Sequence, residues 1–134
     1  MLRRMRNTTG FTLVEILIVV VMLAILFAIA VPIYVRYVAQ ARAAEAQEAI
    51  SSIWAASKVF NAQTGTWPTR VEQLRQLQFD EALRRKWTFT ITVGGRGINT
   101  ISAISTGMMA GGAGKQVTFT TETAEWRGYG TDTY

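Results

Sequence analysis

Few side chains in this 134-residue chain are of a type that performs chemistry. The sequence contains no cysteine and no histidine, which removes disulfides, thiolate nucleophiles, imidazole bases and the usual zinc or haem ligands. No remaining residues pair a nucleophile with a base, so we predict a protein that is not an enzyme and needs no cofactor. The side chain that stands out is Glu15, a single carboxylate within an apolar run.

The glycine-rich run Gly107–Lys115 is a candidate phosphate loop because it ends in a Gly-Lys pair. The next residue is Gln116 instead of Ser or Thr, and a β-strand is predicted where a phosphate loop needs a helix N-terminus. We therefore interpret the run as a flexible connection between two strands.

The basic run Arg84–Lys86 precedes Trp87, and a basic patch beside an aromatic ring is suited to single-stranded nucleic acid. A short charged run before a strand is more typical of a solvated turn, so nucleic acid is a weak candidate partner. A calcium site would need six to eight oxygen ligands. We predict no metal, because only three acids follow the basic run: Glu122, Glu125 and Asp132.

Glu15 is the only charged residue between Phe11 and Val35, and the run from Ile16 to Val31 has no polar residue. Such a run is about as long as a bilayer-spanning helix. An unpaired carboxylate in hydrocarbon costs a few kcal/mol, so Glu15 is expected to have a partner. The next basic residue along the chain is Arg36, which is too far away to serve.

A short basic leader with arginines at positions 3, 4 and 6 precedes this run. A secretory signal peptide is cleaved after its apolar stretch, whereas here the small residue Gly10 lies before it. Cleavage at Gly10 would keep the apolar helix in the mature protein. The arginines favour the cytoplasmic side, which sends the C-terminal head across the membrane.

The segment Gly10-Phe11-Thr12-Leu13-Val14-Glu15, followed by an apolar run that reaches Pro32, resembles type IV prepilins and the pseudopilins of type II secretion. The resemblance implies that a prepilin peptidase cuts between Gly10 and Phe11 and methylates the new N-terminus at Phe11. It also implies that Glu15 meets the amine of Phe11 on a neighbouring subunit during assembly.

The same resemblance implies a structural subunit of a type IV pilus, which self-associates into a helical filament through its N-terminal helices. Its partners would be the prepilin peptidase, the inner-membrane pilus assembly machinery and the membrane itself. The precursor would lie in the inner membrane and the filament on the cell surface, serving motility, adhesion or DNA uptake. Two alternatives stay open, a type II secretion pseudopilin and a DNA-binding minor pilin.

The elements that hold these residues are predicted to form an α+β fold, in which a long N-terminal helix packs against a three- to four-stranded antiparallel sheet. Pro32 cannot donate to the carbonyl four residues back, so we expect a kink there, and the span from Ala24 could unwind in a filament.

We predict three parts along the chain: a leader at 1–10, a membrane or filament-core helix at 11–34 and a pilin head at 35–134. Within the head we predict a helix at 35–60, a loop and short helix at 61–83 and the sheet at 86–129.

Within the head, small and apolar residues recur every three or four positions along the helix and predict a buried stripe. These residues are Ala46, Ala49, Ile50, Ile53, Ala56, Ser57 and Phe60. Thr69 and Glu72 have the spacing of a capping box and predict a second helix with an apolar face at Val71, Leu74 and Leu77. Alternation of apolar residues and threonines predicts strands at 87–93, 98–105 and 116–121, with an edge strand or packed tail at 126–129.

Overall fold

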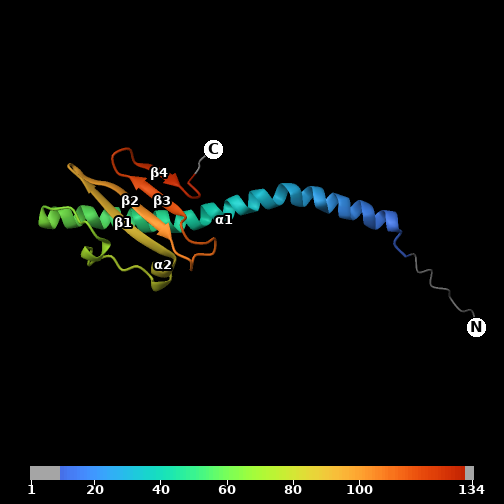
Figure 1. Cartoon of the computed structure of the whole chain (residues 1–134), viewed down its shortest axis with the longest axis horizontal. Coiled ribbons are helices and arrows are strands. Elements are labelled where there is room, and N and C mark those ends of the chain that lie inside the picture. Colours follow the sequence, from blue (N-terminus) through green and yellow to red (C-terminus); the bar gives the residue numbers. More distant parts are fainter. Residues whose placement is uncertain (1–9, 132–134) are drawn as a thin grey trace, which may run out of the picture. The chain divides into compact units, whose positions relative to one another are not determined.

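The computed structural model describes residues 10–131 and has the predicted α+β architecture (Figure 1). The elements in chain order are α1 (Leu13–Thr64), the 3-10 turn η1 (Val71–Gln73), α2 (Glu81–Lys86), β1 (Trp87–Gly94), β2 (Gly97–Ser105), β3 (Gln116–Thr120) and β4 (Glu125–Gly128). The chain divides into two compact units between Val35 and Arg36. We call the second unit, as far as residue 131, the head.

The first unit is the apolar beginning of α1. Every side chain from Leu13 to Val35 is exposed, and this part of the helix is long and apolar enough to cross a membrane. Leu, Ile and Val occupy every face of this part of the helix, which is typical of a helix surrounded by hydrocarbon or by other helices. α1 runs through Pro32 without interruption, and the bend expected at this residue stays a prediction.

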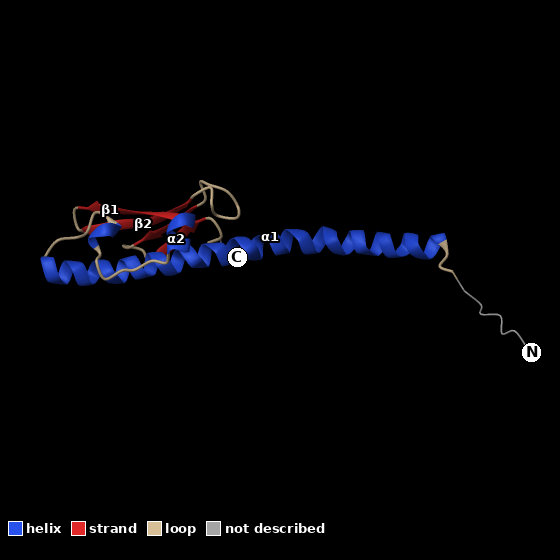
Figure 2. Cartoon of the chain, turned by 90° about the horizontal axis from the view of Figure 1, so that it is seen from below, coloured by secondary structure: helices blue, strands red, loops and turns tan. Residues whose placement is uncertain are grey.

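The head contains a four-stranded antiparallel sheet in which each strand pairs with its neighbour in sequence, in the order β1-β2-β3-β4. The pairing of β1 with β2 shifts by one residue between Thr92 and Val93, close to the turn that joins them. In Figure 2 the strands lie along one side of the C-terminal half of α1. The fourth strand confirms the edge strand expected near Trp126, which packs on Phe119 with ring centroids 4.7 Å apart.

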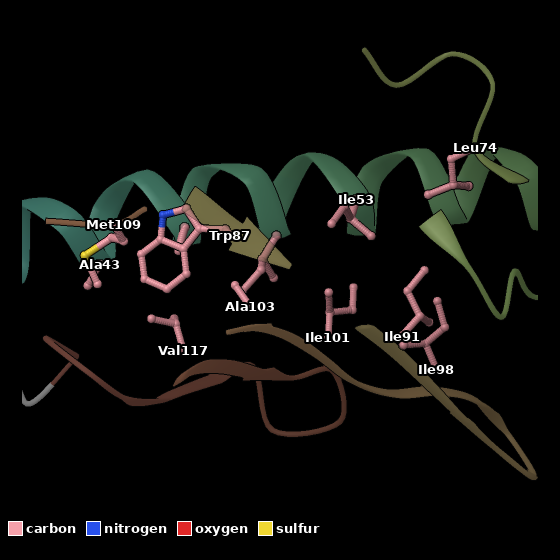
Figure 3. Close-up of a cluster of buried hydrophobic side chains, with 12 residues drawn as sticks. Ala43, Ile53, Leu74, Trp87, Ile91, Ile98, Ile101, Ala103, Met109 and Val117 are labelled. Atoms are coloured by element: carbon pink, nitrogen blue, oxygen red, sulfur yellow. The ribbon is translucent and has the colours of Figure 1, made fainter. Parts of the chain in front are cut away.

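The core of the head lies between α1 and the inner face of the sheet (Figure 3). The stripe predicted on α1 is confirmed: most of its residues are buried, while Ala56 and Phe60 are half-buried at its margin. Alternate residues of the strands face this stripe because side chains on a strand point to opposite faces in turn. The sheet and its connections contribute Leu74, Trp87, Ile91, Ile98, Ile101, Ala103, Met109 and Val117.

The capping box predicted from Thr69 and Glu72 is wrong. The side-chain oxygen of Gln73 accepts the backbone N–H groups of Thr69 at 2.8 Å and of Arg70 at 3.0 Å. This caps a single 3-10 turn, which ends at Leu74 because its φ of −86° and ψ of 75° lie outside the helical region. The α-helix of this region begins later, where the carboxylate of Asp80 accepts the Ala82 N–H at 3.4 Å and caps α2.

The connection between β2 and β3 is held in place, although the sequence predicts a flexible loop. Met109, in its middle, is only 3% exposed and belongs to the core. The hydroxyl of Ser105 donates to the carbonyl of Gly112 at 2.8 Å and accepts the N–H of Lys115 at 2.8 Å. The Gly-Lys pair leads directly into β3, so the loop has no helix N-terminus to receive a phosphate.

Candidate functional site at the N-terminus of the long helix

The first turn of α1 is closed by hydrogen bonds between Thr12 and Glu15. Thr12 is the residue before the helix, and its backbone N–H donates to Glu15 Oε2 at 2.8 Å. Its hydroxyl donates to the same oxygen at 2.9 Å and accepts the Glu15 N–H at 3.2 Å. This reciprocal pattern is a capping box, which satisfies two backbone donors that a helix otherwise leaves without partners.

The capping box changes the interpretation of Glu15. From sequence we expected its carboxylate to need a partner outside its own segment, but Thr12 supplies one within the same turn. The sequence carries the signal for this turn as the Thr-x-x-Glu spacing at positions 12 to 15. Both donors are neutral, so the carboxylate gains hydrogen bonds without gaining an opposite charge.

Gly10 and Phe11 directly precede this turn, and both are exposed. A Cβ placed on Gly10 would meet no atom within 4 Å, and no left-handed backbone is recorded for it. Nothing in the described part of the fold therefore requires glycine at position 10. The leader arginines expected to set the orientation lie outside the described residues.

The helix that follows presents apolar side chains on all sides. Phe11 and Leu13 are each 83% exposed, and no residue of the most apolar 18-residue window is buried. Ala24, Ala28 and Ala30 are small enough for another helix to approach closely. A surface of this kind is stable in hydrocarbon or against helices of the same kind, and not in water.

The other candidate sites lose support in the structure. Trp87 is only 1% exposed, so the aromatic ring of the weakly favoured nucleic-acid patch lies in the core. Of the adjoining basic residues, Arg85 pairs with Glu81 at 2.6 Å and Lys86 with Glu45 at 2.9 Å. Among residues 10–131, no group of three or more Asp or Glu side chains comes together in a way that could hold a metal ion.

A helix that is apolar all round, capped by a lone carboxylate and joined to a small α+β head, defines a single-helix membrane-anchored protein. Residues 5–31 match the family model described as a prokaryotic N-terminal methylation motif, the signature of the type IV prepilins and pseudopilins. The match supports a precursor of the pilin or pseudopilin type, and it covers 27 of the 134 residues. The matched residues include the predicted processing site and the capping box, but none of the head. No solved structure matches the chain.

Proposed function

We propose that this chain is a structural subunit of a type IV pilus filament. A prepilin peptidase would remove residues 1–10, Phe11 would be methylated, and the apolar helix at 11–34 would pass from the inner membrane into a filament core with the head at 35–134 outside. The observation that carries the proposal is the position of Glu15. It is the only charged residue of the apolar segment, and it caps the turn that begins beside the cleavage site.

The capping box suggests how cleavage and assembly are coupled. In the precursor, the nitrogen of Phe11 is part of a neutral peptide bond, and within residues 10–131 the Glu15 carboxylate accepts hydrogen bonds from the neutral donors of Thr12. Cleavage converts this nitrogen into an amine that carries positive charge. A charged amine on one subunit and a charged carboxylate on the next attract each other strongly in a low-dielectric environment. The pair forms only between chains that have been cut.

Two substitutions at Glu15 separate the capping function from the charge. Glu15→Gln keeps an oxygen that can accept the Thr12 N–H, because Glu and Gln both serve at this position of a capping box. Glu15→Ala removes both the acceptor and the charge. We expect both variants to insert into the membrane and to be cleaved, but neither to form filaments. Filament formation by Glu15→Gln at the wild-type level would overturn the pairing of charges.

Cleavage is tested at Gly10, where a larger side chain has room in this chain. Gly10→Val should therefore leave the structure unchanged and stop processing. The measurement is the mass of the protein after co-expression with a prepilin peptidase, with the unmodified chain as the positive control. A Gly10→Val protein that is cut as completely as the unmodified chain would contradict the assignment. Imaging of long filaments outside the cell separates a pilus subunit from a secretion pseudopilin.

A further inference from the structure

The end of the head at which the chain enters it is built around residues Ala39 to Glu45 of α1. The tail after β4 lies against it, since a Cβ placed on Gly130 would lie 2.5 Å from the carbonyl oxygen of Ala39 and 2.7 Å from the Cβ of Ala43. The loop between β2 and β3 also reaches it, because a Cβ on Gly111 would lie 2.8 Å from Nη1 of Arg42.

Two more segments meet at this end. The end of α2 is fixed to α1 by the ion pair between Lys86 and Glu45 at 2.9 Å, and to the β2–β3 loop by a hydrogen bond from the Thr106 N–H to the Lys86 carbonyl at 2.8 Å. Lys115, at the end of that loop, places its ammonium 5.8 Å from the ring of Tyr129 in the tail. Four separate stretches of chain therefore bring their side chains to one end of the head.

Positive charge is concentrated at this end. We define the basic collar as the five cations that these segments place there: Arg42, Arg84, Arg85, Lys86 and Lys115. Two of the cations are paired with Glu81 and Glu45, and Asp80 caps the same helix α2, which leaves a net excess of two positive charges. Over the other described residues from 37 to 131, five cations stand against four anions: Lys58, Arg70, Arg75, Arg96 and Arg127 against Glu48, Glu72, Glu122 and Glu125.

An apolar side chain projects from the same end. Met108 is 70% exposed, whereas its neighbour Met109 is 3% exposed and holds the loop to the core. The hydroxyl of Ser105 ties the later part of that loop to β2. Met108 is thus held out in water by a loop that is fixed on both sides.

This end of the head follows the apolar segment within a few residues along the chain. Tyr34 and Tyr37 are 70% and 67% exposed, and tyrosines at the end of a spanning helix mark the membrane–water interface. At 1.5 Å per residue, Glu45 lies about 12 Å along α1 from Tyr37. The screening length at physiological salt is about 8 Å, so the basic collar lies within or just beyond the range of the surface charge of the bilayer.

We propose that the basic collar and Met108 dock the head on the anionic phospholipid surface of the membrane in which the apolar segment is inserted. The proposal requires that α1 spans a membrane, and it does not depend on filament formation. Each basic side chain near such a surface strengthens binding by about fivefold. Met108 adds an apolar group that enters the interface between headgroups and acyl chains. A subunit awaiting assembly would then rest on the bilayer with its head held down.

The test uses the full chain in vesicles and a fluorophore attached to a single cysteine, which the absence of native cysteine allows. One label replaces Met108, and a control label replaces Arg96, an exposed residue in the β1–β2 turn. Brominated lipids quench a fluorophore that touches the bilayer. In phosphatidylglycerol–phosphatidylcholine vesicles we expect quenching at position 108 and none at position 96, with loss of the quenching at high salt.

Two sets of substitutions that each remove three positive charges test whether the basic collar makes the contact with the lipid. Arg42→Gln, Arg84→Gln and Lys115→Gln together should lower the ratio of docked to undocked heads by about a hundredfold. Arg70→Gln, Arg75→Gln and Arg96→Gln together remove the same charge elsewhere and should leave the ratio unchanged. Flotation with the vesicles reports insertion of α1, and near-ultraviolet circular dichroism reports the fold. The salt dependence of quenching is measured on the chain labelled at position 108 and needs no charge-removing variant.

Three results would overturn the proposal. The first is equal quenching at position 108 in vesicles of phosphatidylcholine alone, which would show that the tether and not the charge brings the head down. The second is unchanged quenching after removal of the collar charges. The third is quenching that depends on the number of protein chains per vesicle, which would identify a second copy of the chain as the partner of this end.

Discussion

The buried indole of Trp87 allows a quantitative test of how the core of the head is packed and hydrogen-bonded. This residue is 1% exposed, and its Nε1–H is a buried donor without a hydrogen-bond partner among residues 10–131. A buried donor that has lost its water without gaining another acceptor costs about 1–3 kcal/mol. Trp87→Phe removes that donor and keeps an aromatic ring at the same place in the core.

The cost of the substitution follows from the atoms removed. Phenylalanine lacks two carbons of the indole, and at about 0.8 kcal/mol per buried carbon the loss is about 1.6 kcal/mol. The relief of the unpaired donor is of the same size or larger, so we expect the free energy of unfolding to change by no more than about 1.5 kcal/mol, with either sign. Trp87→Ala creates a cavity and should cost about 3–5 kcal/mol.

The assay is thermal unfolding of the full chain in detergent micelles, followed by near-ultraviolet circular dichroism of the three other tryptophans: Trp54, Trp67 and Trp126. For a head of this size, each kcal/mol shifts the midpoint by about 4–8 °C. The Ala variant should unfold at least about 12 °C below the unmodified chain. A Phe variant that unfolds as early as the Ala variant would refute the reasoning, because the indole N–H would then be satisfied.

Two further predictions concern the helix start and the sheet edge. Thr12→Val removes the hydroxyl that accepts the Glu15 N–H and should weaken the first turn of α1 by about 1 kcal/mol. Amide exchange at Glu15 in a bilayer would then be about fivefold faster, while Thr12→Ser should exchange as the unmodified chain does. Gly128→Ala should detach the tail, because its Cβ would lie 2.2 Å from the Gln116 carbonyl oxygen, and amide exchange of β4 would show this. Gly114→Ala has a similar positive φ but free space around it, so exchange as fast as in Gly128→Ala would contradict the clash.

The sequence predicted the helix and the processing motif because both depend on residues close together in the chain. The apolar run and the stripe of Ala46 to Ser57 repeat with the helical period, and no distant contact is needed to recognise them. The same local reasoning failed at Thr69, where Glu72 and Gln73 are both suitable caps and only the geometry of the turn selects Gln73. Local reasoning also does not separate the two Thr-x-x-Glu motifs of the chain. Thr12 and Glu15 form a capping box, whereas Thr69 and Glu72 have the same spacing and do not.

The ordered conformation of the β2–β3 loop could not be predicted from the sequence, because it depends on contacts with distant residues. Its glycines indicate flexibility when each is taken alone, but Met109 enters a core whose α1 residues, Ala43 to Ile53, lie 56 to 66 positions earlier. The side-chain bonds of Ser105 likewise depend on the loop already being folded back. The basic collar is also produced by folding, because its members come from α1, α2 and this loop.

The two roles of α1, membrane segment and part of the core of the head, have a consequence for proteolysis. The helix that carries the membrane segment also supplies the inner wall of the head, where Ala43 is the first buried residue and Ser57 the last. A protease that cut between Val35 and Arg36 would release a head with all of its buried side chains. A cut after Ala46 would leave part of the core behind in the membrane and expose the inner face of the sheet. Shedding of an intact head therefore requires cleavage in the few residues between Val35 and Ala43, and most cuts farther along α1 would produce fragments for degradation.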